Sequence, residues 1–207
     1  HIGLAGAHRL EHLHAVHARH GNIGDDHVKF LLGQQGKTFL AAESAQREVA
    51  QGRAGRLLCF NRLLGRSLRE KLMDVVGLRV GTLHQEMLRL AGMSGPPADA
   101  DSDFWERVLP EKALEGLAER SAEEVGDFLI VDEIQDIATG TYLDLLDLLV
   151  KGGLRDGRVL MFGDFERQAI YGSEGAREVL RARSPHLASF RLSENCRNLP
   201  RIGYQVN

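Results

Sequence analysis

The sequence predicts an α/β fold in which a parallel sheet is flanked by helices. Short, continuous apolar runs alternate with segments of helical periodicity from residue 28 onward, and such alternation builds right-handed strand–helix–strand units with parallel strands. The runs lack a polar alternation, as expected of strands that are buried on both faces. Polar clusters follow three of the runs, at the strand end where ligands bind in this architecture.

The individual elements follow from the position of the apolar residues. The predicted strands are the apolar runs at 28–32, 56–60, 78–82, 128–131, 159–162 and 190–192. The segments between them combine helical spacing with good helix formers. We therefore predict helices over 39–51, 62–72, 85–90, 104–120, 142–150 and 174–183, and a turn over 33–38.

The predicted organisation is one domain preceded by a short segment. Residues 1–26 are predicted to be helical and hold six of the nine histidines. A solvated helix is favoured there over a metal site, because no carboxylate or cysteine set completes one. The domain is predicted to span 27–207, with a linker and small helical insertion at 92–120 that begins in a stretch rich in Gly, Pro, Asp and Ser.

Composition and charge exclude several classes of protein. The 207 residues are 43% hydrophobic and 27% charged, which is ordinary for a globular domain. The net charge of −3 provides no overall positive field, so any nucleic acid must bind in a local cleft. Two cysteines without a CxxC pair indicate neither a zinc nor a redox motif and fit a cytoplasmic protein. No apolar run is long enough to predict a membrane span.

Gly36-Lys37-Thr38 has the residue types of a phosphate-binding loop. Backbone N–H groups at a helix start and the lysine charge bind phosphates, and a threonine hydroxyl is a ligand for Mg²⁺. The full G-x-x-x-x-G-K-[ST] pattern needs a glycine where this chain has Leu31. A truly short loop and the loss of a few loop residues both explain this spacing, and the intact flanking strand and helix favour the second.

Asp132-Glu133 is the second candidate half of a site, since the pair follows a buried apolar strand. An aspartate in this position coordinates Mg²⁺ directly or through water, and an adjacent glutamate orients or deprotonates an attacking water. Two solvated acids at a strand end are the alternative interpretation. The upstream Lys37 and Thr38 favour the catalytic one, because phosphoryl transfer from ATP uses both sets of groups.

The order of these motifs resembles that of the UvrD/Rep-like superfamily 1 DNA helicases. The segments that carry the resemblance are 57–61 (a DNA-contacting motif), 82–84 (T-F-H), 131–136 (D-E-x-Q-D), 163–171 (G-D-x-x-Q-x-I-Y, with one extra residue before the glutamine) and 192–197 (L-x-x-N-x-R). With the Gly-Lys-Thr element they extend from about Leu32 to Arg197. The resemblance implies a RecA-like P-loop NTPase fold.

The resemblance also implies ATP and Mg²⁺ as cofactors and a role for each matching residue. The implied nucleotide-binding residues are Gly36, Lys37, Thr38, Asp132 and Tyr171, of which Thr38 and Asp132 would bind Mg²⁺. The implied catalytic residues are Glu133 as activator of water, Gln168 as sensor of the γ-phosphate and Arg197 as an arginine finger. Cys196 stands where many members carry a tyrosine that stacks on the nucleotide base.

The implied activity is ATP-dependent movement along single-stranded DNA, with RNA as the other possible substrate. Phe60, Asn61, Thr82 and His84 would line the strand's path, where rings stack bases and polar groups hold phosphates without reading sequence. A second RecA-like domain is the expected partner and would follow Asn207. We therefore expect this chain alone to bind nucleotide weakly and not to unwind DNA.

Three other interpretations stay open. In the first interpretation, the chain is another type of P-loop NTPase. The D-E-x-Q-D box and residues 168–171 argue against this interpretation. In the second it is a nucleic-acid-binding or scaffold module with a degenerate ATP site. In the third it is a structural interaction domain, and the polar strand ends are coincidental.

Overall fold

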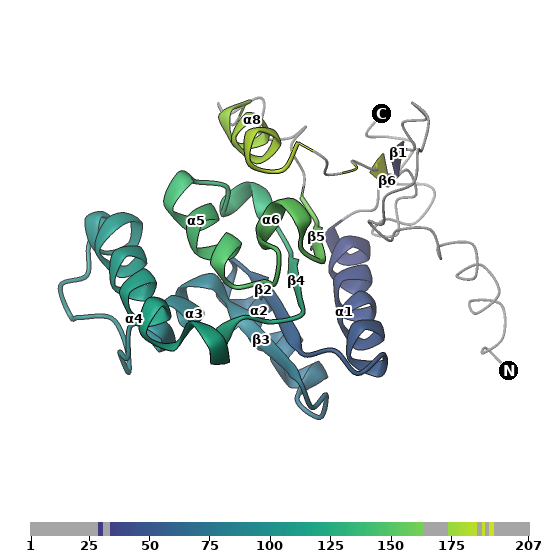
Figure 1. Ribbon diagram of the computed structural model, residues 1–207, viewed down its shortest axis with the longest axis horizontal. Coiled ribbons are helices and arrows are strands. Elements are labelled where there is room, and N and C mark those ends of the chain that lie inside the picture. The colour runs from purple at the N-terminus through teal and green to yellow at the C-terminus, as the bar shows by residue number, and fades with distance from the viewer. Residues whose placement is uncertain (1–28, 31–33, 164–173, 186–187, 189–190, 193–207) are drawn as a thin grey trace, which may run out of the picture.

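The computed structural model describes residues 29–30, 34–163, 174–185, 188 and 191–192 (Figure 1). The predictions for the histidine-rich segment at 1–26 lie outside the described residues. Among the helices of the described part, none combines the length and the apolar content needed to cross a membrane.

Four parallel strands form the central sheet, which confirms the predicted α/β class. The strands are β2 (Gly55–Cys59), β3 (Leu78–Thr82), β4 (Phe128–Val131) and β5 (Val159–Met161), in the spatial order β3-β2-β4-β5. Cys59 is in register with Thr82, Leu58 with Val131, and Val131 with Met161. The carboxyl ends of all four strands therefore meet at one edge. A separate two-stranded parallel pair joins β1 (Lys29–Phe30) to β6 (Arg191–Leu192).

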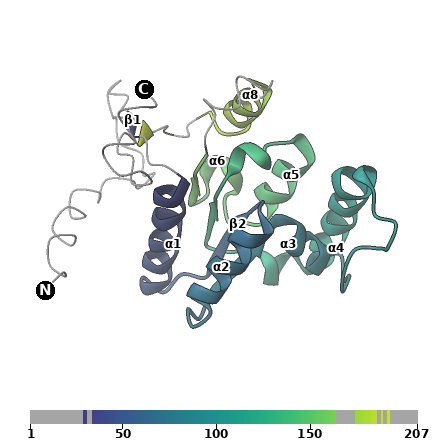
Figure 2. The same ribbon diagram turned by 180° about the vertical axis from the view of Figure 1, so that it is seen from behind.

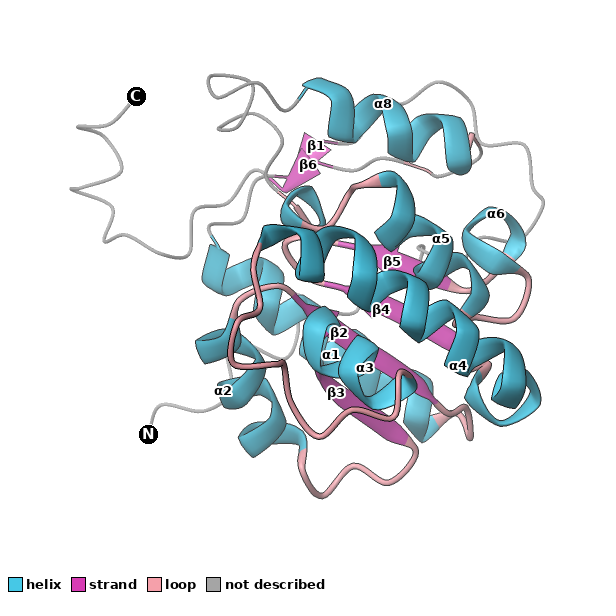
Figure 3. Cartoon of the chain, turned by 90° about the vertical axis from the view of Figure 1, so that its left-hand side faces the viewer, coloured by secondary structure: helices cyan, strands magenta, loops and turns pink. Residues whose placement is uncertain are grey.

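Helices cover both faces of this sheet (Figure 3). The helical elements are α1 (Gln34–Ala50), α2 (Arg62–Leu72), α3 (Leu83–Leu90), the π-helical turn η2 (Phe104–Val108), α4 (Leu109–Glu124), the 3₁₀ turn η3 (Ile134–Asp136), α5 (Gly140–Leu148), α6 (Gly153–Asp156) and α8 (Glu174–Arg183). Figures 1 and 2 show α1 and α4 on opposite sides of the sheet.

The continuous apolar character of the strands is explained by two separate cores. In β4, Phe128 and Ile130 pack with α1 and α2, whereas Leu129 and Val131 pack with α3, α4 and α5. Because successive side chains of a strand point to opposite faces, every residue of a doubly covered strand is buried. The four β4 side chains are at most 2% exposed. This burial fixes the position of β4, and with it the position of the residues that follow Val131.

Three helices begin earlier in the chain than predicted; one of them, α5, starts at Gly140 instead of residue 142. The predicted turn over 33–38 is wrong from residue 34 onward, because α1 starts at Gln34 and contains Gly36, Lys37 and Thr38. Two glutamines, which are good helix formers, extend the helix backward. Helix α3 starts at Leu83 instead of residue 85, because Thr82 and Gln85 form a reciprocal capping box that satisfies backbone N–H groups of the first turn. The predicted insertion helix is confirmed as η2 and α4 and continues to Glu124.

A buried ion network ties this insertion to the sheet. Arg56 on β2 donates from Nε to Glu86 Oε1 of α3 at 2.7 Å and from Nη2 to Glu124 Oε2 of α4 at 2.8 Å. Its Nη1 donates to the Leu149 carbonyl at 3.3 Å. Arg79 and Arg89 also pair with the same two glutamates. The network lies at the amino end of β2, away from the strand ends that carry the predicted site.

The arginines keep both glutamates ionised despite their burial. Hydrogen bonds from Arg89 and then Arg79 lower the pKa of Glu124 to about 2, against the opposing effect of burial. Burial on its own would raise the pKa of Glu86, but hydrogen bonds and charge from Arg89 and Arg56 lower it below its usual value. Paired in this way, buried charges are tolerated, whereas removal of one partner leaves the remaining buried charges less well compensated.

We expect Arg56→Met to lower the free energy of unfolding by about 3 kcal/mol, because Arg56 is the only arginine of the network that is itself buried, at 4% exposure. Urea unfolding at pH 7.5 measures the loss. The matched control is Arg66→Met, which breaks an exposed pair with Glu70 on α2 and should cost less than about 1 kcal/mol. Equal losses in the two variants would contradict a structural role for the network.

Candidate functional site

The residues of the two predicted half-sites meet at the carboxyl edge of the sheet. Thr38 Oγ1, in the second turn of α1, donates to Asp132 Oδ2, directly after β4, at 2.5 Å. The Asp132 backbone N–H donates to the Leu58 carbonyl at 2.8 Å, which extends the pairing of β2 and β4 by one residue. Lys37, Asp132 and Glu133 are 6%, 0% and 7% exposed. The fold thus brings together side chains that are 94 positions apart in the chain.

Burial disfavours the ionised form of the Asp132 carboxyl group. Removal from water raises its pKa to about 6, and the negative charge of Glu133 adds to this effect. The Thr38 hydrogen bond, the Glu133 backbone N–H and the positive charge of Lys37 oppose it without cancelling it. A buried carboxyl group with a perturbed pKa is typical of functional sites, because the position is maintained at the expense of stability.

Glu133 occupies an unusual backbone conformation. Its φ of 55° and ψ of 46° lie in the left-handed region, and no other non-glycine residue in the described part has a positive φ. Hydrogen bonds on both sides hold it there: Glu133 N donates to Asp132 Oδ1 at 3.0 Å, and Ile134 N donates to the Phe162 carbonyl at 2.9 Å. Such strain concentrates at functional positions, where the surrounding structure enforces it.

The Glu133 side chain is also held in place. Gln135 Nε2, on the 3₁₀ turn η3, donates to Glu133 Oε2 at 2.6 Å. Gln135, two residues later in the chain, therefore orients the Glu133 carboxylate. This arrangement can present a carboxylate as a proton acceptor in a fixed direction.

The donor atoms at this edge suit a small, hard cation next to a polyphosphate. Mg²⁺ prefers oxygen ligands and binds through one or two protein oxygens together with phosphate oxygens; Thr38 Oγ1 and Asp132 Oδ2 are such oxygens and already lie in contact. The ammonium of Lys37 lies close enough to Asp132 to lower its pKa. Within the described ranges, no group of three or more His, Cys, Asp or Glu residues is arranged as an all-protein metal site.

Two of the four predicted nucleic-acid residues serve as helix caps. Asn61 Oδ1 accepts from Leu63 N at 2.9 Å and Leu64 N at 3.1 Å, at the start of α2. Thr82 Oγ1 accepts from Gln85 N at 3.2 Å, and the Thr82 side chain is buried. Both residues terminate a strand and start a helix, which accounts for their residue types independently of any ligand.

The other two residues, Phe60 and His84, form part of a cluster of rings. The Phe60 and His84 ring centroids are 5.0 Å apart, and those of His84 and Trp105 are also 5.0 Å apart, in an edge-to-face arrangement. Tyr142 packs against His84 at 6.0 Å. Phe60 is 37% exposed, so the cluster reaches the surface beside the carboxyl ends of β2 and β3. We call Phe60, His84 and Trp105 the aromatic strip.

The structure does not place every predicted site residue. Gln168, Tyr171 and Arg197 lie outside the described residues, as does Asp164 of the third polar strand end. Gly36, Lys37, Thr38, Asp132 and Glu133 are described, and these are brought together.

Sequence reasoning missed Trp105 and Tyr142. They come from η2 and α5, and their contact with His84 depends on how α4 and α5 pack, which no spacing in the sequence encodes. The only signal was that Trp105 is the sole tryptophan of the chain. The buried role of Arg56 was also missed, because it stands next to the apolar run of a strand and resembles a solvated strand end.

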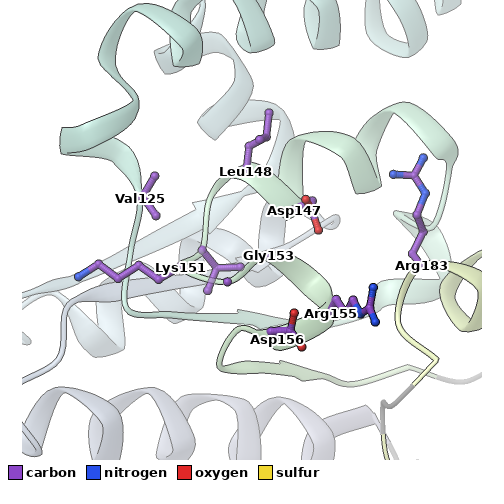
Figure 4. A pocket seen from close by; sticks show the side chains of 10 residues that line it. Val125, Asp147, Leu148, Lys151, Gly153, Arg155, Asp156 and Arg183 are labelled. Atoms are coloured by element: carbon purple, nitrogen blue, oxygen red, sulfur yellow. The ribbon is translucent and has the colours of Figure 1, made fainter.

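A surface hollow of about 640 Å³ lies elsewhere, at the amino ends of β4 and β5 (Figure 4). Charged side chains surround it, among them Lys151 and Arg183. These two pair with Asp127 and Asp144, so their charges are already compensated by neighbours. The hollow shares no residue with the site at the carboxyl edge, and the chemistry described above favours that edge.

Comparison of the chain with protein-family models and with curated proteins gives no match. The function must therefore be inferred from the geometry and chemistry of the site.

Asp132→Asn is expected to stabilise the chain at neutral pH by roughly 3 kcal/mol, the equivalent of about two pKa units. The folded pKa of about 6 exceeds the ordinary 3.8. Protonated Asp132 therefore makes its full contribution to the free energy of unfolding below about pH 4, and this contribution is lost as the pH rises through 6. Urea unfolding of both proteins from pH 4 to 8, without divalent cations, should show a difference that grows over this window.

Asp136→Asn is the matched control, since Asp136 is an exposed carboxylate in the same segment. Because the side chain is exposed, its substitution should change the free energy of unfolding by less than about 0.5 kcal/mol at pH 7.5. A stability difference between Asp132→Asn and the parent that stays constant from pH 4 to 8 would contradict the raised pKa of Asp132.

Because the backbone of Glu133 is strained, we expect the usual order of stability of a glycine and an alanine variant to be reversed at this position. Both Glu133→Gly and Glu133→Ala remove the carboxylate, but only glycine adopts a positive φ without steric cost. We expect the glycine variant to be the more stable by about 1 kcal/mol, whereas glycine is normally the less stable residue within regular structure. Urea unfolding of the pair measures this difference, and an alanine variant of equal or greater stability would refute the strain.

Proposed function

We propose that this chain is the ATP-binding domain of a superfamily 1 type motor that moves along single-stranded nucleic acid. The fold class established above, a parallel sheet with helices on both faces, is compatible with a RecA-like P-loop NTPase and with other nucleotide-binding folds. The finer assignment depends on the site and on the order of the motifs in the sequence.

The hydrogen bond from Thr38 Oγ1 to Asp132 Oδ2 carries this proposal. Phosphoryl transfer from ATP needs a lysine and a hydroxyl from a phosphate-binding segment beside an acidic pair from a neighbouring strand. Here these groups come from α1 and from the end of β4, and they are buried at one edge of the sheet. Two unrelated polar strand ends would have no reason to place a buried lysine against a buried aspartate.

Each residue of the site then has a defined task. Lys37 binds the phosphate oxygens, and Thr38 and Asp132 would hold Mg²⁺, which when bound neutralises charge on the phosphates. Glu133 accepts a proton from the attacking water, and Gln135 keeps its carboxylate oriented for this step. The proposal extends to Gln168, Tyr171 and Arg197 as γ-phosphate sensor, nucleotide contact and arginine finger.

The aromatic strip supports the nucleic-acid part of the proposal. An exposed Phe60 beside His84 offers ring faces on which unpaired bases of any type can stack. Asn61 and Thr82 contribute by fixing the helix starts that position these rings. The strip is formed by residues at the carboxyl ends of β2 and β3 and by the insertion, at the same edge of the sheet as Asp132.

One observation favours a second candidate, a nucleic-acid-binding module with a degenerate ATP site. Leu31 stands where the phosphate-binding pattern requires a glycine. Such a module would bind single-stranded DNA through the aromatic strip and would fail to bind ATP. Measurement of both ligands on the same preparation separates the two candidates, because the motor requires both.

In the complete motor, which by this proposal includes a second RecA-like domain, we expect ATPase activity that single-stranded DNA stimulates, together with loss of function in two variants of different kind. Lys37→Ala should weaken binding of a fluorescent ATP analogue roughly 10- to 100-fold, the effect of losing charge-assisted hydrogen bonds to phosphate. Glu133→Gln should bind the analogue normally and hydrolyse ATP at least about 100-fold more slowly, because only the proton acceptor is lost. Steady-state phosphate release and fluorescence titration measure these effects.

Lys151→Ala is the control for Lys37→Ala, since Lys151 is a lysine at the opposite end of the sheet with a surface ion pair. Its ATP affinity and ATPase rate should equal those of the parent. The motor proposal fails if DNA does not stimulate hydrolysis and Lys37→Ala is indistinguishable from the parent.

A further inference from the structure

The hydrogen bonds of Tyr142 determine which nitrogen of His84 carries the proton. Tyr142 Oη contacts the Trp105 carbonyl at 3.0 Å and His84 Nε2 at 3.3 Å. A carbonyl oxygen only accepts, and a phenol has a single proton to donate. Both contacts are satisfied only if Tyr142 donates to Trp105 and accepts from His84. His84 is therefore protonated on Nε2.

The other ring nitrogen, Nδ1, then acts as a hydrogen-bond acceptor. In neutral imidazole one nitrogen donates and the other accepts, and burial lowers the pKa of His84, which favours the neutral form. The two nitrogens point in nearly opposite directions, so Nδ1 is directed away from Tyr142. Within the described residues, the structure records no hydrogen-bond or ion-pair partner for His84 besides Tyr142.

We propose that His84 offers Nδ1 as a hydrogen-bond acceptor at the centre of the aromatic strip, and that it binds an N–H group of an unpaired nucleobase. This inference rests on the proposed function and names the chemistry that the strip recognises. A phosphate oxygen is itself an acceptor, so it cannot bind this nitrogen, whereas the bases of nucleic acids carry N–H donors on their pairing edges.

The neighbouring rings fit a base rather than a sugar–phosphate group. Phe60 and Trp105 both contact His84, each with its ring centroid 5.0 Å from that of the imidazole. A base that stacks on the exposed Phe60 ring lies next to the imidazole of His84. Trp105, on the insertion, packs edge-to-face against His84, and its carbonyl accepts a hydrogen bond from Tyr142. The insertion therefore acts on nucleic-acid binding through His84, with Tyr142 as the positioning residue.

The test uses three twelve-residue oligomers that differ by one group per nucleotide: deoxyuridylate, N3-methyl-deoxyuridylate and uridylate. The methyl group removes the base N–H, and the ribose form adds a 2′-hydroxyl donor. Binding to the 207-residue chain is followed by the fluorescence of Trp105, the sole tryptophan, and by anisotropy of labelled oligomers. We expect N3-methylation to weaken binding about fivefold, the equivalent of one neutral hydrogen bond.

Two variants assign this difference to the strip. His84→Phe keeps a ring but has no acceptor, so it should bind the methylated and unmethylated oligomers equally. Tyr142→Phe keeps its ring but releases Nε2, and it should lose most of the discrimination. Leu148→Ala, an exposed position on the same helix, is the matched control and should discriminate as the parent does. Thermal unfolding of each variant tests whether the fold is retained.

The salt dependence of binding provides an independent readout. If His84 contacts a base, His84→Phe leaves the slope of log affinity against log salt unchanged; if it contacts a phosphate, the slope falls by about 0.7. Three results would overturn the inference. One is a smaller salt slope in His84→Phe, and another is equal affinity of the parent chain for the two deoxy oligomers. The third is that His84→Phe lowers the affinity for the ribose oligomer only, which would assign the contact to the 2′-hydroxyl. In these cases the proposed motor function survives, whereas binding of no oligomer by the parent overturns both.

Discussion

The common direction of four strands, in a sheet with helices on both faces, is the constraint on which the rest of the structure depends. The central strands β2 and β4 are buried along their whole length, so polar side chains with a chemical task are confined mainly to the strand ends. Because the strands are parallel and in register, their carboxyl ends form one edge. Thr82, Asp132 and the helix that carries Thr38 meet there for this reason, and the loops and helices that follow the strands can vary without moving them.

The two ends of the sheet use buried charge in opposite ways. At the amino end, Arg56 and its partners hold Glu86 and Glu124 ionised, with the pKa of each glutamate lowered. At the carboxyl end, Asp132 is buried with fewer compensating groups, and its pKa is raised to about 6. The first arrangement connects the insertion to the sheet. The second keeps a carboxylate in a position that costs stability, which is typical of a site shaped by function. Under the proposed function, Mg²⁺ and phosphates would compensate this charge.

The backbone at the carboxyl end of the sheet is also unusual, because Glu133 has a left-handed conformation. A left-handed glutamate held by hydrogen bonds from both directions directs the segment from β4 into η3 and then into α5. Helix α5 carries Tyr142, which contacts His84 and Trp105. The segment that begins with the acidic pair therefore leads through η3 and α5 to a residue that contacts the aromatic strip. Under the proposed function this segment joins the site of ATP hydrolysis to the site of nucleic-acid binding.

The sequence by itself determined the class of fold, most of the strands and helices, and the two half-sites, because apolar periodicity and strand-end polarity are local properties. The helix over Arg62–Leu72 and the strand Leu78–Thr82 were predicted with their observed limits, since Asn61 and Thr82 are local caps. The start of α1 was misplaced, because the glycines at positions 33 and 36 predict a turn, whereas the helix in fact begins at Gln34. Only the tertiary structure decided the contact of Thr38 with Asp132, the burial of Arg56 and the meeting of Trp105, Tyr142 and His84. These depend on packing between elements far apart in the chain, where the energy comes from burial and charge pairing that no local pattern records.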